Sequence, residues 1–251
     1  MPLAITAPKN FSDYPDFEYP CPECNIGFLV PDRSTFKKIE PPYSESAHGH
    51  EAWDPGWITF RFTVTCVCNK KDCGEVAFVS GKGGVDQRYG YDRHPEYYEH
   101  FTIQSFFPSP RLCYIPPETP SEVENLLERS FALYWVEASA AANSLRASLE
   151  ALLDELNVPT HERNKRGETV RMSLHRRLDV WADTNKDHAD LCYALKEVGN
   201  LGSHGDVVKP KHYFGSLEIY SYVLKELFEN NAQKMKELAK NIQDDIKTKK
   251  P

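Results

Sequence analysis

The chain has 251 residues, of which 40% are hydrophobic, so it is long enough for one large or two small globular domains. Its net charge of -7 argues against nucleic-acid binding over the whole surface, although a local basic patch is possible. No apolar run approaches the roughly 20 residues of a membrane helix, and residues 1–10 lack a secretory leader pattern, so we expect a cytoplasmic protein without membrane contact.

The cysteines point to a metal site in the first third of the chain. Seven cysteines are present, and an odd number without a leader pattern favours metal ligands over a disulfide framework. Cys21 and Cys24 are separated by two residues, and a second cluster supplies Cys66, Cys68 and Cys73. Four thiolates suit a closed Zn²⁺ site, which is structural because no coordination position is left for water.

The strand before the second cluster indicates which cysteines bind the ion. Apolar residues alternate with polar ones from residue 58 to residue 66, so Cys66 shares the apolar face and is expected in the core. We therefore predict a Zn²⁺ ion bound by four thiolates, those of Cys21, Cys24, Cys68 and Cys73. The spacing between Cys68 and Cys73 is wider than usual, which leaves Cys66 open as a replacement for Cys68.

Further β-structure is expected up to the proline-rich linker. Residues 75–80 are predicted to form the returning strand, residues 81–84 a glycine turn, and residues 101–107 another strand. Residues 1–117 are thus predicted to be a small β-rich domain held by zinc. Two histidines, two carboxylates and two tryptophans in residues 48–57 allow either a second ligand site or a solvated loop.

Residues 118–251 are predicted to be all-helical, which makes the chain an α+β protein. Ser121 and Glu124 form a capping box at the start of the first helix, and a break is expected at residues 137–139. The next helix should reach about residue 157, a short one should cover residues 174–181, and the last should begin near Gly215.

Residues 161–177 contain the only basic concentration of this acidic chain, with six Arg or Lys against two Glu. One interpretation is a solvated loop that leads into a short helix. The other is a contact to an anion or to an RNA backbone, which arginine suits through charge and bidentate geometry. The candidate residues are Arg163, Lys165, Arg166, Arg171, Arg176 and Arg177.

An apolar helix pattern at residues 191–201 runs into an end with three glycines. Gly199 lies inside the pattern, where glycine costs about 1 kcal/mol relative to alanine, so we expect close helix–helix contact there. Asn200 and His204 are four residues apart and share a face while the helix persists. They form either a helix end with local hydrogen bonds or a polar site where two helices meet.

Several motifs together resemble the family of domains of unknown function called DUF4145. Such domains occur alone or attached to restriction and other anti-phage proteins, so the resemblance implies prokaryotic defence. It also implies an HEPN-like helical bundle, from a superfamily whose active members are metal-independent ribonucleases that act as dimers. The motifs are Cys21-Pro22-Glu23-Cys24, Cys68, Cys73-Gly74-Glu75, residues 141–153 and residues 195–204.

The match to the ribonuclease motif of that superfamily is incomplete. The motif places an arginine and an adjacent polar residue a few positions before a histidine. His204 matches the histidine and Asn200 the polar residue, but positions 197–199 hold no arginine. Lys196 lies one position further out and carries a charge without the guanidinium fork.

Two functions follow from this comparison. The first is a non-catalytic, zinc-stabilised interaction module that pairs with itself or with a protein partner, or that binds a small anionic ligand near Asn200 and His204. The second is a ribonuclease or toxin in which His204 is the acid–base residue, Asn200 orients, and Lys196 or the basic run binds RNA phosphate. We prefer the first because the arginine that would stabilise the transition state is missing from the motif.

Overall fold

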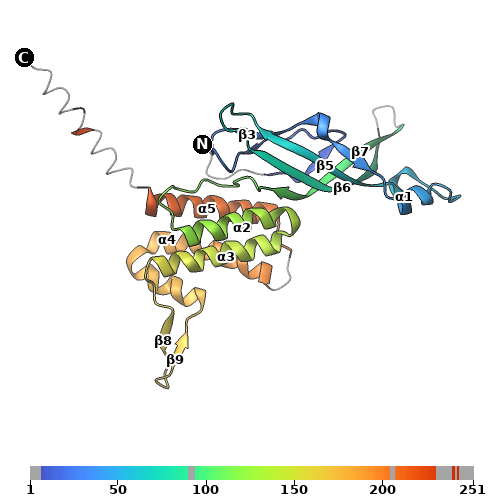
Figure 1. Cartoon of the computed structure of the whole chain (residues 1–251). Helices are drawn as coiled ribbons and strands as arrows, with labels where there is room; N and C mark the ends of the chain where they lie inside the picture. Colours follow the sequence, from blue (N-terminus) through green and yellow to red (C-terminus); the bar gives the residue numbers. More distant parts are fainter. Residues whose placement is uncertain (1–6, 90–93, 204–206, 230–238, 241, 243–251) are drawn as a thin grey trace, which may run out of the picture.

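The computed structural model describes residues 7–89, 94–203, 207–229, 239–240 and 242. It consists of an amino-terminal β-sheet part and a carboxy-terminal helical part (Figure 1). The predicted fold class, α+β with a β-rich unit followed by helices, is confirmed. None of the described helices combines the length and the apolar character needed to span a bilayer.

The amino-terminal part is an antiparallel sheet of seven strands in the described residues, in the order β1-β7-β6-β5-β3-β2, with β4 also paired to β5. The strands are β1 Asn10–Ser12, β2 Tyr19–Pro20, β3 Phe28–Pro31, β4 Lys37–Ile39, β5 Thr59–Cys68, β6 Val76–Tyr89 and β7 Pro95–Phe107. The alternation predicted for β5 is confirmed, because Phe60, Phe62 and Val64 are buried on one face. A short helix α1, Pro42–Ala47, lies between β4 and β5.

The expected glycine turn at residues 81–84 is wrong, because β6 continues through it to Tyr89. The reason is packing by the neighbouring strands. A Cβ on Gly81 would lie 2.1 Å from the carbonyl oxygen of Thr102, and one on Gly83 would lie 2.4 Å from Cδ1 of Phe101. Glycine lets β7 and its aromatic side chains approach the backbone of β6 at these positions.

The carboxy-terminal part packs four helices, which are α2 Ser121–Val136, α3 Ala138–Glu155, α4 Leu174–Ser203 and α5 Pro210–Phe228. The predicted break between the first two helices is confirmed at Glu137. The short helix expected at residues 174–181 is the start of α4, which continues past a kink at Asn185. The last helix begins at Pro210 rather than near Gly215, since proline fits the first turn of a helix.

Most of the basic run at residues 161–177 forms a β-hairpin rather than a loop without structure, and its last four residues begin α4. Residues 161–171 form a hairpin of β8, His161–Arg163, and β9, Thr169–Arg171. The hairpin projects from the helices on the side opposite the sheet (Figure 1). It carries part of the basic run away from the helical core.

The two parts share one core where α2 meets the sheet. Trp135 is buried, and its ring centroid lies 5.3 Å from that of Tyr19 and 5.2 Å from that of Phe106. The indole Nε1 donates to Ser109 Oγ at 3.1 Å. The neighbouring Tyr134 hydroxyl donates to the carbonyl oxygen of Ala7 at 2.9 Å.

Candidate functional site

Four cysteine sulfurs converge at one end of the sheet. The Sγ atoms of Cys21, Cys24, Cys68 and Cys73 all lie within 4.8 Å of one another. The distance is 3.7 Å between Cys21 and Cys73 and 3.8 Å between Cys24 and Cys68, far longer than the roughly 2.05 Å of a disulfide. The group could hold a metal ion, and no other His, Cys, Asp and Glu group in the described part of the chain is arranged in this way.

Strand pairing brings the two halves of this cluster together. Cys21 and Cys24 lie in the turn that links β2 to β3. Cys68 ends β5, and Cys73 lies in the turn before β6. The antiparallel register of β3 and β5 places Leu29 opposite Cys68, which sets the two turns side by side.

The surroundings of the sulfurs shift the pKa values of the thiols in opposite directions. The Gly27 amide lies 3.3 Å from Cys24 Sγ, and amide hydrogen bonds from Gly27 and then Ile26 lower the pKa of Cys24 to about 6. Burial raises the pKa of Cys21 to about 12. A cation at the centre of the cluster would favour the thiolate form at all four positions, since metal ligands must be deprotonated. Gly27 is also needed for space, because a Cβ there would lie 2.6 Å from Cys68 Sγ.

Cys66, the alternative ligand, lies outside the cluster. It is fully buried, and burial raises the pKa of its thiol to about 12. Cys66 and Cys68 both face inward from β5, but only Cys68 reaches the end of the strand where the turns meet. The structure therefore assigns Cys66 to the apolar core.

A second group of polar residues lies where α3 and α4 cross. A Cβ on Gly199 would lie 2.7 Å from Cβ of Arg146, which confirms the predicted close helix contact. Arg146 Nη1 donates to Oδ1 of Asn200, and Arg146 Nε pairs with Glu150 Oε1 at 3.3 Å. Asn200 thus bonds across the two helices rather than only locally. His204 lies outside the described residues.

Arg146 is the residue of this polar group that the sequence motifs did not indicate. It brings a guanidinium to the polar residue of the incomplete ribonuclease motif from a position 54 residues earlier in the chain. Two signals in the sequence could have found it. Arg146 and Glu150 are four apart on one helix, and Gly199 needed a neighbouring helix close by.

Lys196 faces a different set of groups. Its Nζ pairs with Glu197 Oε1 at 2.6 Å and lies 3.4 Å from Nδ1 of His175. The hydrogen bond from Lys196 holds the pKa of Glu197 below its usual value. The ring of His175 contacts that of Tyr193, whose hydroxyl donates to Asp179 and whose pKa this bond raises to about 12.

The structure does not bring the six basic residues of residues 161–177 onto one surface. Arg177 is buried and pairs with Asp154 at 2.7 Å, and Arg176 pairs with Glu162 at 3.0 Å. Arg163, Lys165 and Arg166 are exposed on the hairpin, and Arg171 lines a cavity at the base of the hairpin.

The sheet exposes an apolar patch beside the cysteine cluster. We define the apolar patch as Val67, Val76, Phe78 and Phe107, which are 38%, 40%, 63% and 73% exposed. Phe78 is the register partner of Phe107, and Val76 that of Val67, so the four side chains share the outer face. A groove of about 530 Å³ lies beside the patch and includes Glu23, which adjoins a cysteine ligand.

The loop of residues 48–57 shows no sign of a second metal site. His48 Nε2 lies 2.9 Å from Glu40 Oε1, and its ring centroid is 4.8 Å from that of Trp53. The His50 ring lies 5.5 Å from that of Trp57. Aromatic contacts therefore account for both histidines, in agreement with the solvated-loop alternative.

Comparisons with known proteins assign a family to each part. Residues 128–245 match the model of Domain of unknown function (DUF4145), and residues 9–109 match that of Domain of unknown function (DUF8608). No curated protein and no solved structure matches the chain. The resemblance to DUF4145 is confirmed for the helical motifs at residues 141–153 and 195–204. The cysteine motifs of that resemblance lie in the DUF8608 match instead.

Proposed function

We propose that this chain, in which a DUF8608 domain precedes a DUF4145 domain, is a non-catalytic interaction module. The observation that carries the proposal is the apolar patch on the outer face of the sheet. Phe78 and Phe107 form a cross-strand pair and are both more than half exposed. Contiguous exposed apolar side chains with a polar rim are typical of protein-binding surfaces.

The rim of the patch indicates the kind of partner. Glu23, Glu75 and Glu128 line the groove beside the patch, and the one arginine there, Arg111, is already bonded to Glu124 and Glu128 at 2.7 and 2.8 Å. Two copies meeting through this face would bring like charges together. The partner is therefore a different protein with an apolar centre and basic residues around it, and self-pairing is the alternative outcome.

The metal in this proposal is Zn²⁺ with a structural role. Four sulfurs at about 2.3 Å from a tetrahedral zinc ion lie about 3.8 Å apart. Two of the sulfur pairs, Cys21–Cys73 at 3.7 Å and Cys24–Cys68 at 3.8 Å, fit this edge length. Zinc would fix the turns that border the apolar patch, and with four protein ligands it leaves no position for a reacting water.

In-cell photocrosslinking tests the interaction. A photoreactive phenylalanine analogue replaces either Phe78 or the control Tyr89, which lies on the same strand and is 73% exposed. We expect a discrete crosslinked protein from position 78 only, and its loss when Phe107→Ser is added. Equal crosslinking from both positions, or a product made only of two copies of this chain, would contradict a foreign partner on this face.

The cellular setting that we expect is prokaryotic anti-phage defence, as the family resemblance implies. Plating of phages on cells that carry or lack the gene measures this directly. Equal plating for every phage tried would remove the defence role and leave the interaction module unaffected.

The contact between Arg146 and Asn200 favours a second candidate function, a metal-independent endoribonuclease. Arg146 is a cation that could stabilise a phosphate transition state next to the position of the incomplete motif. In this candidate, His204 is the acid–base residue and Asn200 is held in place by Arg146.

Incubation of the purified protein with tRNA and mRNA separates the two candidates. The interaction module predicts no cleavage by the wild type. Cleavage that is lost in both His204→Ala and Arg146→Gln would establish the ribonuclease instead. Lys225→Gln is the matched control, because Lys225 lies on α5 and pairs with Glu229 rather than with Asn200.

A further inference from the structure

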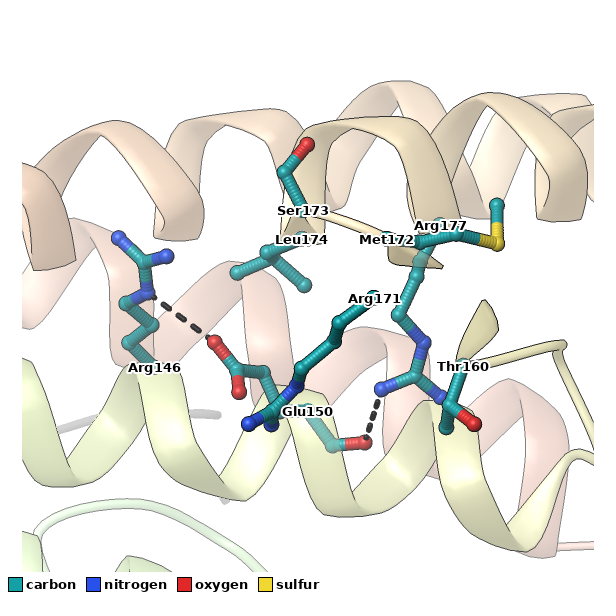
Figure 2. Close-up of a pocket in the computed structure, with 8 residues that line it drawn as sticks. All are labelled: Arg146, Glu150, Thr160, Arg171, Met172, Ser173, Leu174 and Arg177. Carbon is teal, nitrogen blue, oxygen red and sulfur yellow. Dashed lines mark hydrogen bonds and ion pairs between the residues drawn. The ribbon is translucent and has the colours of Figure 1, made fainter. Parts of the chain in front are cut away.

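We propose that the cavity between α3, the end of β9 and the start of α4 is a binding site for a phosphate group. Its volume is about 280 Å³, at the small end of the range of ligand pockets. The polar residues that line it are Arg146, Glu150, Thr160, Arg171, Ser173 and Arg177 (Figure 2). The cavity belongs to the helical domain, so this inference goes beyond the proposed function and does not depend on it.

The charge of the cavity is opposite to that of the whole chain. Three guanidinium groups and one carboxylate, that of Glu150, line it in a chain with a net charge of -7. Glu150 is engaged by Arg146 at 3.3 Å. Guanidinium groups that enter from three separate elements suit a tetrahedral oxyanion, because its oxygens point in several directions.

Arg177 is held in place by several hydrogen bonds, and one of its N–H groups has no acceptor among the described residues. The residue is 5% exposed, and its guanidinium donates to Asp154 at 2.7 Å and to two backbone oxygens of α3 and the following turn. Its Nε is buried and has no acceptor among the described residues. Buried donors ordinarily have a partner, so this Nε leaves the Arg177 guanidinium one acceptor short in the wall of the cavity.

Arg171 is the lining cation without a carboxylate partner in the described part of the chain. It ends β9, and its side chain extends toward α3 (Figure 2). Arg146 and Arg177, by contrast, both form ion pairs. This exposed guanidinium in the wall of the cavity, without an ion pair among the described residues, is available to an incoming anion.

The first turn of α4 adds to the positive potential. Ser173 and Leu174 line the cavity at the start of α4, whose first helical segment runs to the kink at Asn185. Ser173 Oγ accepts a hydrogen bond from the Arg176 amide at 3.2 Å, which fixes the turn. The amino terminus of a helix carries a partial positive charge that favours anions.

Titration of the full-length protein with inorganic phosphate at constant ionic strength tests the site, with calorimetry and ³¹P NMR as readouts. Arg171→Gln should weaken phosphate binding about tenfold, the loss expected for a charge-assisted hydrogen bond. Arg171 is exposed and forms no ion pair with the described residues, so this variant should fold normally. Arg163→Gln is the matched control, since it removes the same charge from the same hairpin outside the cavity and should leave binding unchanged.

Two results would overturn the proposal. One is equal weakening in Arg171→Gln and Arg163→Gln, which would mean attraction by diffuse charge alone. The other is no saturation by phosphate up to about 10 mM.

Two further ligands identify the source of the phosphate. Stronger binding of AMP than of phosphate, with single-stranded RNA bound only when its 5′ end is phosphorylated, would support a mononucleotide or terminal phosphate. Equal binding of dephosphorylated RNA, still weakened by Arg171→Gln, would support the internal RNA backbone.

Discussion

Gly199 determines how closely α4 approaches α3, and we predict that Gly199→Ala lowers the free energy of unfolding. Alanine normally stabilises a helix interior by about 1 kcal/mol relative to glycine. Here its Cβ would lie 2.7 Å from Cβ and 3.0 Å from Cδ of Arg146, and overpacking typically costs about 1–3 kcal/mol. We expect a net loss of up to about 2 kcal/mol in a denaturant titration followed by circular dichroism.

Gly215 provides the control for this prediction. It lies in α5, and a Cβ there would meet nothing within 4 Å. Gly215→Ala should therefore stabilise the protein by about 0.5–1 kcal/mol. An equal gain from both alanines would mean that the helices do not touch at Gly199.

The cysteines allow a second prediction at the scale of single residues. Cys73→Ser should abolish the bound zinc of protein purified under native conditions, whereas Cys66→Ala should keep it. Cys66 is fully buried and Cys73 only partly buried. If zinc were lost through general destabilisation of the protein, Cys66→Ala would therefore lose more zinc than Cys73→Ser. Elemental analysis of the two variants at known protein concentration measures the outcome. Zinc retained by Cys73→Ser would contradict the four-thiolate site.

At the scale of elements, the glycines of β6 let β7 lie against the strand. We predict that Gly83→Ala costs about 3 kcal/mol of stability, because its Cβ would lie 2.4 Å from Cδ1 of Phe101 and 2.6 Å from the carbonyl oxygen of His100. The free energy of unfolding from a urea titration measures the loss. Gly49→Ala, where the nearest atom is 3.9 Å away, should change it by less than about 0.5 kcal/mol. Similar values for both variants would place Gly83 outside a packed sheet.

The same strand shows what the sequence could and could not predict. The alternation in β5 predicted both its buried face and a core position for Cys66, because burial on one face leaves a period of two. The glycines of β6 have the local preference of a turn, and only pairing with β5 and β7 on both sides makes them part of a strand. Pairing between distant segments cannot be read from a local pattern.

The candidate sites show the same difference between features that a local sequence pattern predicts and features that depend on packing between distant segments. Cys21 and Cys24 followed from their short spacing, and Cys68 and Cys73 from the strand alternation that put Cys66 in the core. The partner of Asn200 did not follow, since Arg146 reaches it through helix packing. The basic residues of positions 161–177 likewise do not lie together in the structure. The hairpin exposes some of these arginines, while α4 buries Arg177.

At the scale of the whole molecule, α2 joins the two parts into one folding unit. Trp135 is 1% exposed and lies between aromatic rings of the sheet and the helical core. Tyr134 stacks on Tyr213 of α5 at 5.2 Å and also bonds to the carbonyl oxygen of Ala7. Unfolding of either part would expose these side chains, and burial of each large side chain contributes roughly 2 kcal/mol.

Removal of the metal should therefore destabilise the helices as well as the sheet. We predict that a strong zinc chelator lowers the melting temperature of the helical circular dichroism signal at 222 nm by about 10 °C or more, in a single transition. Ligand binding at saturation contributes about 4 kcal/mol to the free energy of unfolding. Each kcal/mol moves the melting temperature of a chain of this size by about 2–4 °C. Excess zinc added after the chelator should restore the original transition. A helical signal that melts at an unchanged temperature while the sheet unfolds would show that the contacts of Trp135 do not couple the two parts.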